Sequence, residues 1–288
     1  MPEKMSDGRP WPPISIVTPS FNQAAFLEET IRSVLLQGYP NLEYIVIDGG
    51  SSDQSVEVIE QYATWLAYWV SEPDRGQAHA INKGFARASG QIFAWLNSDD
   101  IYEPEALQRI ATKLARSPAC NLVYGDGSYI DLDGQKTGQC DWIQPYDRRR
   151  FQTFNFILQP AAFWRRSLWE RAGPLDARYQ YAMDWEWFLR ATRLTEPHYL
   201  PFELARWRIG PEIKTRSGGR ERRAEIAEIT RRFGGIRQPT YIVYQLDRLT
   251  WNVTDRLEGK ISDRGLRILS APARWIVKDT LWKGRYLS

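Results

Sequence analysis

Two adjacent carboxylates, Asp99 and Asp100, end the segment Asn97–Asp100, which directly follows the short apolar run 91–96. Side by side they repel each other, and a divalent cation that bridges them to a diphosphate would relieve that repulsion. Because hard oxygen ligands suit Mg²⁺ or Mn²⁺, the pair could form a metal site. Helix capping is the alternative, since aspartate is favoured near the start of a helix and a helix is expected from Pro104.

A further carboxylate, Asp48, ends the apolar run 42–47 and precedes Gly49 and Gly50. Its oxygens could accept the imide N–H of uracil or thymine, or ribose hydroxyls, and the glycines would permit a ligand to approach the backbone closely. Tight turns also take Asp-Gly readily, and the pattern taken alone favours the turn.

Two cationic side chains could contact a diphosphate. Arg75 lies just before a predicted helix over residues 77–88, and Lys83 lies within it. Each could donate charge-assisted hydrogen bonds to phosphate oxygens, and each could equally lie on the surface without a ligand.

Asp184 begins a helix predicted over residues 183–195, among bulky apolar residues. Such surroundings can raise the pKa of a carboxylate toward a value that suits a general base. Glu186 and Arg190 are spaced i,i+4 and are predicted to pair on the helix surface, which leaves Asp184 as the better candidate. The alternative is a carboxylate that stabilises the helix N-terminus through the helix dipole.

The elements that must position these side chains alternate between strand and helix in the first part of the chain. The predicted strands cover residues 14–19, 42–47, 67–70 and 91–96, and the predicted helices begin near Asn22, Ser52 or Asp53, Gln77 and Pro104. This alternation predicts an α/β fold with a mostly parallel sheet flanked by helices. Ligands of such sheets bind beyond the carboxyl ends of the strands, where Asp48 and Asp99 are expected.

After residue 120 the pattern changes. A hairpin is predicted around Asp133-Gly134, with strands over 122–130 and 135–139, followed by a strand over 161–164. From about residue 215 the chain is predicted to be helical, basic and amphipathic. Residues 1–204 carry a net charge of −7 and residues 205–288 one of +10, which together give the +3 of the whole chain; a basic tail on an acidic body suggests an anionic partner for the tail.

The composition of the chain argues against several classes of protein. With only two cysteines and two histidines in 288 residues, a disulfide framework, a zinc site or a Ser-His-Asp hydrolase is hard to build, and a reducing compartment is expected. The polar start of the chain does not resemble a signal peptide, and no apolar run is long enough for a membrane span. The 13 tryptophans could stack on sugars, line an interface or fill the core.

The order and spacing of these segments resemble the family 2 glycosyltransferases, which are inverting enzymes with a GT-A fold. The matching segments are Ser15–Asn22, Tyr44–Asp53, Ser71–Gly76, Asn82-Lys83-Gly84, Ala88-Ser89-Gly90 and Leu96–Asp100. The resemblance weakens after them and returns at Met183–Arg190. It implies a GT-A catalytic domain over residues 1–215, with a nucleotide-binding half over about 14–118 and an acceptor half over about 119–215. A helical extension over residues 216–288 follows.

The resemblance also implies a role for individual residues. The nucleotide-sugar donor would be held by Pro19, Ser20, Phe21, Asn22, Asp48, Gly49, Arg75, Lys83, Asn97, Ser98 and Asp99. Asp99, supported by Asp100, would bind Mn²⁺ or Mg²⁺, and Asp184 would be the catalytic base. Trp185 and Glu186 would lie on the acceptor side.

The sequence departs from the family pattern twice. Asn97 replaces the first acid of the Asp-x-Asp motif, which leaves one charge fewer near the metal. Gly210 stands where a related segment often carries histidine, so that a diphosphate or metal contact would be missing or would pass to Arg208 or Lys214. The alternative for this segment is a surface loop.

The function implied is transfer of a sugar from a nucleoside diphosphate, with UDP favoured and GDP and dTDP open, to a saccharide or lipid-linked acceptor in polysaccharide or glycolipid biosynthesis. No motif indicates nucleic-acid binding. The basic, tryptophan-containing segment 261–288 could lie in a membrane interface or pack on protein, and the expected location is the cytosol or the inner face of the membrane. A sugar-nucleotidyltransferase would carry a Gly-rich loop where Pro19–Asn22 stands, and a degenerate binding protein would be expected to lack Asp99 or Asp184.

Overall fold

The computed structural model describes residues 4–210, 219–235, 241–242 and 244–245. The chain divides into two compact units, one of residues 1–147 and 155–217 and the other of residues 148–154 and 218–288. The sequence-based boundary at residue 215 falls outside the described residues and stays a prediction. Lys214 and the segment 261–288 lie outside the described residues.

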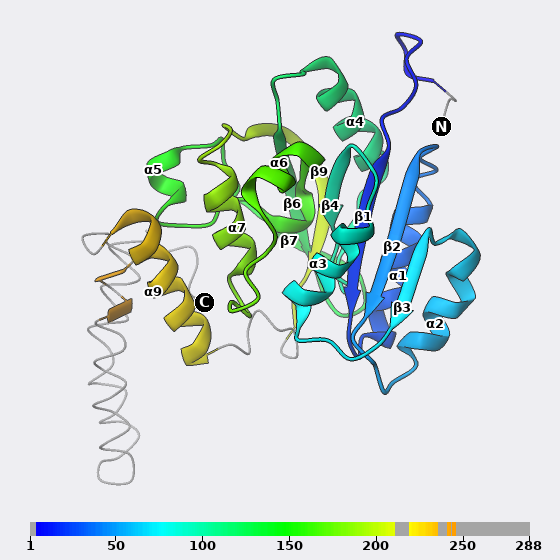
Figure 1. Cartoon of the computed structure of the whole chain (residues 1–288), viewed down its shortest axis with the longest axis horizontal. Helices are drawn as coiled ribbons and strands as arrows, with labels where there is room; N and C mark the ends of the chain where they lie inside the picture. The colour runs from blue at the N-terminus through cyan, green and yellow to red at the C-terminus, as the bar shows by residue number, and fades with distance from the viewer. Residues whose placement is uncertain (1–3, 211–218, 236–240, 243, 246–288) are drawn as a thin grey trace. The chain divides into compact units, whose positions relative to one another are not determined.

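The first unit is built on one mixed sheet whose strand order is β3-β2-β1-β4-β8-β6-β9-β5, with β7 paired to β6 (Figure 1). The strands are β1 (Ile14–Ser20), β2 (Leu42–Asp48), β3 (Tyr68–Ser71), β4 (Ile92–Trp95), β5 (Ile101–Tyr102), β6 (Leu122–Ile130), β7 (Lys136–Gln139), β8 (Ala162–Arg165) and β9 (His198–Arg208). Strands β1 to β4 pair in parallel, as the sequence predicts. Strand β8 then runs antiparallel to both β4 and β6.

The direction of β6 and β9 decides where the site is built. Because β8 is antiparallel to both of its neighbours, β6 runs in the same direction as β4, and β9 pairs in parallel with β6. The carboxyl ends of β1, β2, β4, β6 and β9 therefore meet at one edge of the sheet. Ligands of open α/β sheets bind at such an edge.

Helices cover both faces of the sheet in the first unit. They are α1 (Ala24–Leu35), α2 (Ser55–Tyr62), α3 (Gln77–Arg87), α4 (Ala106–Arg116), α6 (Arg166–Ala172) and α7 (Met183–Ala191); the second unit contains α5 (Arg148–Phe151) and α9 (Gly219–Gly234). Helix α3 packs against β1 and β2, and α1 lies on the opposite face (Figure 1). No helix in the described part of the chain is long and apolar enough to cross a bilayer.

The helix predicted to begin near Asn22 is α1, which Asn22 does not cap. Asn22 has a left-handed backbone with φ of 52°, and the helix begins at Ala24. The neighbouring loop supplies the acceptors instead: the Ala24 amide donates to Asp53 Oδ2 at 3.0 Å and the Gln23 amide to Ser55 Oγ at 3.0 Å. Sequence alone did not show this cap because it comes from a segment 29 residues away.

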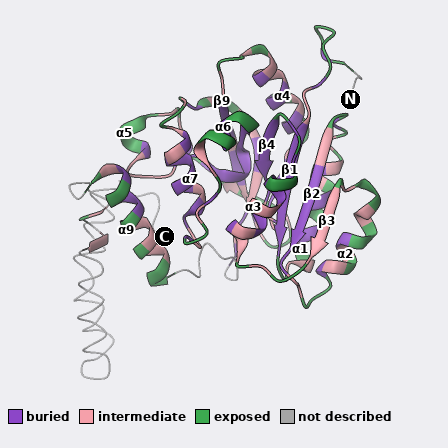
Figure 2. Ribbon diagram, in the orientation of Figure 1, coloured by how far each residue is buried: buried purple, intermediate pink, exposed green. Residues whose placement is uncertain are grey.

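An aromatic cluster fills the core between the sheet and the second half of the unit. Trp95 of β4, Trp164 of β8 and Trp187 of α7 are fully buried, with ring centroids of Trp95 and Trp164 at 5.2 Å and of Trp164 and Trp187 at 4.6 Å. Phe188 stacks on Trp95 at 6.3 Å. These tryptophans therefore fill the core. Figure 2 shows that the central strands β1 and β4 are buried.

Gly84 allows α3 to approach β1 closely, because a Cβ at this position would overlap the methyl groups of Val17. Alanine favours an exposed helix over glycine by about 1 kcal/mol, but overpacking a tight contact costs about 1–3 kcal/mol. We expect the overpacking to outweigh the gain in helix propensity, so that Gly84→Ala lowers the free energy of unfolding by up to about 2 kcal/mol, measured by urea denaturation. Gly138→Ala is the control, since the nearest atom to its Cβ would be Tyr129 Cδ2 at 3.9 Å; an equal loss in both variants would contradict the packing argument.

Candidate active site

Asp48 is fully buried at the end of β2, and the loop that follows uses both of its oxygens. Oδ2 accepts hydrogen bonds from the Ser51 amide at 2.8 Å, the Gly50 amide at 3.1 Å and Ser71 Oγ at 2.7 Å, while Oδ1 accepts one from Ser51 Oγ at 2.5 Å. This geometry gives Asp48 the turn-forming role and argues against the direct nucleoside contact that the family resemblance implies.

The loop after β1 presents an aromatic ring beside this turn. Pro19 and Ser20 end β1 and are buried, whereas Phe21 is 60% exposed. The Asn22 amide donates to Ser51 Oγ, and Asn22 Oδ1 accepts from the Ser52 amide, both at 2.8 Å. The two loops are therefore tied together, with the Phe21 ring on their solvent side.

The two predicted diphosphate contacts differ in their surroundings. Lys83 Nζ pairs with Glu72 Oε1 at 2.7 Å, so part of its charge is already balanced. The Arg75 side chain is exposed and makes no ion pair with any residue that the structure describes. Of the two, Arg75 is the cation that a phosphate could bind without displacing a partner.

Asn97 is held by its neighbours on both sides. Its Oδ1 accepts from Gln77 Nε2 at 2.7 Å, and its Nδ2 donates to Asp100 Oδ2 at 3.0 Å and to Gln159 Oε1 at 3.2 Å. Ser98, the next residue, is buried. The amide of Asn97 therefore joins α3 to the acidic pair rather than serving as an open ligand.

The two adjacent carboxylates have different environments. Asp100 is buried, with Oδ1 accepting from the Arg208 amide at 3.1 Å. Burial, together with the negative charge of Asp99, raises the pKa of Asp100 well above its usual value. Asp99 is only partly buried. Asp99 is therefore the carboxylate that a metal could reach, and Asp100 supports it from the interior rather than as a ligand.

A divalent metal fits this arrangement only if the substrate completes its coordination. The described residues contain no group of three or more histidine, cysteine or acidic side chains that could hold a metal ion by themselves. Mg²⁺ commonly binds through one or two carboxylates together with substrate phosphates and water. Asp99 as a single accessible carboxylate matches that type of site.

Arg208, expected at the acceptor side or on a diphosphate, is completely buried beneath the acidic pair. Its Nε donates to the Asp99 carbonyl at 2.9 Å, and Nη1 donates to the carbonyls of Asp131 at 2.7 Å and Leu132 at 3.1 Å. Nη2 pairs with Glu29 of α1. Because these partners use the guanidinium, Arg208 positions the Asp99 backbone and does not reach a substrate.

Asp184 lies in the first turn of α7, as predicted, and is partly buried. Asn155 Nδ2 donates to Asp184 Oδ2 at 3.0 Å, and Asn155 Oδ1 accepts from the Ile157 amide at 3.2 Å. This asparagine orients the carboxylate. Sequence analysis missed Asn155 because it lies in an irregular segment with no periodicity.

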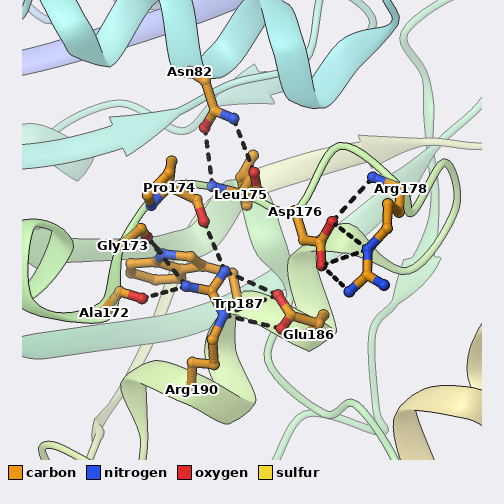
Figure 3. Close-up of polar contacts among 10 residues, drawn as sticks. All are labelled: Asn82, Ala172, Gly173, Pro174, Leu175, Asp176, Arg178, Glu186, Trp187 and Arg190. Atoms are coloured by element: carbon orange, nitrogen blue, oxygen red, sulfur yellow. Dashed lines mark hydrogen bonds and ion pairs between the residues drawn. The ribbon is translucent and has the colours of Figure 1, made fainter.

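Glu186 and Arg190 pair as predicted, but inside the protein rather than on the helix surface (Figure 3). Glu186 is fully buried and accepts from Arg190 Nε and Nη2 at 2.9–3.0 Å. Arg190 also donates to the carbonyls of Ala172, Gly173 and Pro174. Trp185 is buried as well. Arg190, oriented by Glu186, therefore fixes α7 to the segment that precedes it.

Contacts between loops join the Asp184 side to the Asp99 side. Asn82 of α3 and Leu175 exchange two hydrogen bonds of 2.9 Å (Figure 3). A Cβ on Gly76 would lie 2.9 Å from Gln180 Oε1, so the loop before α7 touches the start of α3. Since α3 also reaches Asn97 through Gln77, one continuous set of contacts links the two carboxylates.

Comparison with known proteins agrees with this architecture. The family model described as Glycosyl transferase family 2 matches residues 15–171. An uncharacterised glycosyltransferase of Mycobacterium tuberculosis is 34% identical over 191 residues, which cover 65% of this chain and 71% of that protein. A PGL/p-HBAD biosynthesis glycosyltransferase of Mycobacterium bovis is 30% identical over 183 residues, or 62% and 69% of the two chains.

Solved structures show the same fold at low sequence identity. TarS 1–349 of S. aureus in complex with UDP-GlcNAc has a TM-score of 0.63 at 15% identity, covering 96% of this chain and 93% of that one. A mannosyltransferase of Pyrobaculum calidifontis in complex with GDP-Man and Mn²⁺ has a TM-score of 0.60 at 18% identity, covering 95% and 88%. The predicted GT-A fold is thereby confirmed.

Removal of the Arg208 guanidinium should destabilise the protein strongly. In Arg208→Met, three carbonyls lose a donor and Glu29 loses its cation. Because the Glu29 side chain is 47% exposed, most of the loss should come from the carbonyls. Each buried acceptor left without a donor typically costs about 1–3 kcal/mol, and we expect a total loss of about 3 kcal/mol or more in urea denaturation.

Arg32→Met is the matched control for Arg208→Met. Arg32 lies on α1 and pairs with Glu28 at the surface at 3.9 Å. An exposed pair of this kind contributes about 0–1 kcal/mol. An equal loss in the free energy of unfolding in the two variants would show that the buried Arg208 stabilises the protein no more than a surface arginine does.

Proposed function

Because the chain belongs to glycosyl transferase family 2, we propose that it transfers a glycosyl group from a nucleoside diphosphate sugar to an acceptor hydroxyl with inversion at the anomeric carbon. The observation that carries this proposal is that the segments bearing two partly exposed carboxylates, Asp99 and Asp184, both contact helix α3. The nucleotide sugars bound by TarS and by the Pyrobaculum mannosyltransferase support a donor of this class.

The donor would bind along the carboxyl edge of β1, β2 and β4. The exposed ring of Phe21 offers a stacking surface for a base, and Gly49 beside it leaves room for the Asp74 carboxylate to approach the ring. The Arg75 guanidinium is the cation for the diphosphate, since a planar guanidinium suits phosphate oxygens. Lys83, paired with Glu72, adds positive charge nearby.

Asp99 is the residue that would hold a Mn²⁺ or Mg²⁺ ion together with the donor. Bound there, the ion would neutralise charge on the leaving diphosphate. The chain's own contribution is to hold the Asp99 backbone in place through Arg208 and to keep Asp100 buried behind it.

Asp184 is the proposed general base. The acceptor oxygen forms a bond to the anomeric carbon, the bond from that carbon to the diphosphate oxygen breaks, and the acceptor proton passes to the Asp184 carboxylate. Asn155 holds Asp184 Oδ2 in a fixed orientation, and the buried Glu186–Arg190 pair holds the helix turn that carries it. Attack from the face opposite the diphosphate inverts the configuration.

The acceptor is proposed to be a saccharide or lipid-linked hydroxyl. The relative from Mycobacterium bovis is named for PGL/p-HBAD biosynthesis, which supports an acceptor from glycolipid or polysaccharide assembly. A lipid-linked acceptor would bring the enzyme to the inner face of the membrane.

We expect Asp184→Asn to lower kcat about 10²–10⁴-fold, because a positioned base typically contributes that much. Donor affinity should stay within about threefold of the wild type, since the amide keeps the shape of the side chain. Turnover is measured as nucleotide release with an acceptor that the wild type uses, and ¹H NMR of the product reports the anomeric configuration. Glu60→Gln, on the exposed side of α2, is the control; unchanged kcat in Asp184→Asn or retention of configuration would refute the mechanism.

Asp99→Asn should weaken donor binding when Mn²⁺ is present and leave it unchanged when the metal is removed. We expect the Mn²⁺ concentration that half-saturates donor binding to rise about 10- to 100-fold, the range typical of changes near metal ligands. Calorimetric titration of UDP with and without Mn²⁺ measures this, and affinity in EDTA should be the same for variant and wild type. The same Mn²⁺ dependence in both proteins would remove Asp99 from the metal site.

A further inference from the structure

A carboxylate oxygen of Asp74 occupies the space where residue 49 would otherwise carry a side chain. An ideal Cβ on Gly49 would lie 2.9 Å from Asp74 Oδ2 and 3.3 Å from Phe21 Cδ2. The oxygen and the edge of the aromatic ring are therefore at most about 6 Å apart. Glycine at position 49 is what lets the two side chains come together above the loop after β2.

One oxygen of Asp74 is used by the protein and the other is not. Oδ1 accepts the Gly76 amide at 2.6 Å, which fixes the plane of the carboxylate. Oδ2 accepts no hydrogen bond from the residues that the structure describes. The side chain is partly buried. A single oriented acceptor therefore faces the space beside Phe21.

Asp48, the carboxylate first expected to meet a nucleoside, does not offer such an acceptor. Its oxygens take four hydrogen bonds from Gly50, Ser51 and Ser71, and the residue is fully buried. A base that approached it would have to displace the turn that these bonds form.

We propose that Asp74 recognises the base of the donor, with Oδ2 accepting one imide N–H from a uracil or thymine that stacks on Phe21. This inference rests on the proposed function, because it takes a nucleoside diphosphate sugar as the ligand. It assigns the choice of nucleotide to a residue of the loop between β3 and α3 instead of the loop after β2.

The number of available acceptors favours a pyrimidine with one imide group. Uracil and thymine present a single N–H, flanked by two carbonyls. Guanine presents an imide N–H and a neighbouring amino group, and its second donor would have to share Oδ1 with the Gly76 amide. A base with a single donor therefore fits the free oxygen Oδ2 better. Cytosine presents an unprotonated ring nitrogen at the same place, and its lone pair would repel the carboxylate.

Exchange of Asp74 for asparagine should change base preference in a defined direction. The amide of Asp74→Asn can donate to the ring nitrogen of cytosine, and it loses the charge that strengthens the bond to uracil. We expect the ratio of the CDP and UDP dissociation constants to fall at least about tenfold, in line with loss of one charged hydrogen bond. Calorimetric titration of UDP, CDP and GDP into the full chain with Mn²⁺ measures the ratio, with Glu60→Gln as the charge-matched control.

A second measurement uses the wild type alone and does not depend on how a variant folds. N3-methyl-UDP lacks the imide donor and should bind at least about tenfold more weakly than UDP. 5-Methyl-UDP, which keeps the donor and adds the same bulk elsewhere on the ring, should bind like UDP.

The outcomes separate this inference from the function on which it rests. If the wild type binds UDP but N3-methylation or Asp74→Asn leaves the preference unchanged, or if the wild type binds GDP and not UDP, the role of Asp74 is overturned while glycosyl transfer stands. If no nucleoside diphosphate binds the wild type, the proposed function itself fails.

Discussion

The buried guanidinium of Arg208 is the interaction on which the candidate site depends most. A charge without solvent is costly unless its hydrogen bonds are satisfied, and here three carbonyls and the Glu29 carboxylate satisfy it. Those partners belong to α1, to the loop after β4 and to the turn after β6. Burying one cation therefore fixes three segments relative to β9, and the backbone of Asp99 is among them.

A similar arrangement recurs beside the proposed base. Asp184 is partly exposed, while Glu186, two residues later, is buried against Arg190. At both places an accessible carboxylate stands near a buried one that accepts a hydrogen bond from an arginine, and the guanidinium of that arginine donates to nearby backbone carbonyls. The exposed members can meet a substrate because the buried members and their arginines hold the backbone.

Packing links the two places. Trp95 leads into the acidic loop, and Trp187 and Phe188 of α7 contact it within an aromatic cluster. Such interiors are close-packed and resist deformation. Trp95 and Trp187 therefore help to hold α7 against β4. The exposed aromatic ring beside the candidate site is that of Phe21.

The amino-acid sequence by itself determined the alternating first half of the fold, because apolar runs and helix periodicity are local signals. It also singled out Asp48, Asp99 and Asp184 as candidates, since all three stand at element ends in motifs with recognisable spacing. It did not reveal the antiparallel insertion of β8 or the partners of Arg208 and Asp74. Arg208 and Glu29 are 179 residues apart, and Asp74 meets Gly49 only after folding. Burial and hydrogen bonding between distant segments decided which acidic groups are buried in the interior and which remain accessible to a ligand, and those are properties of the tertiary structure alone.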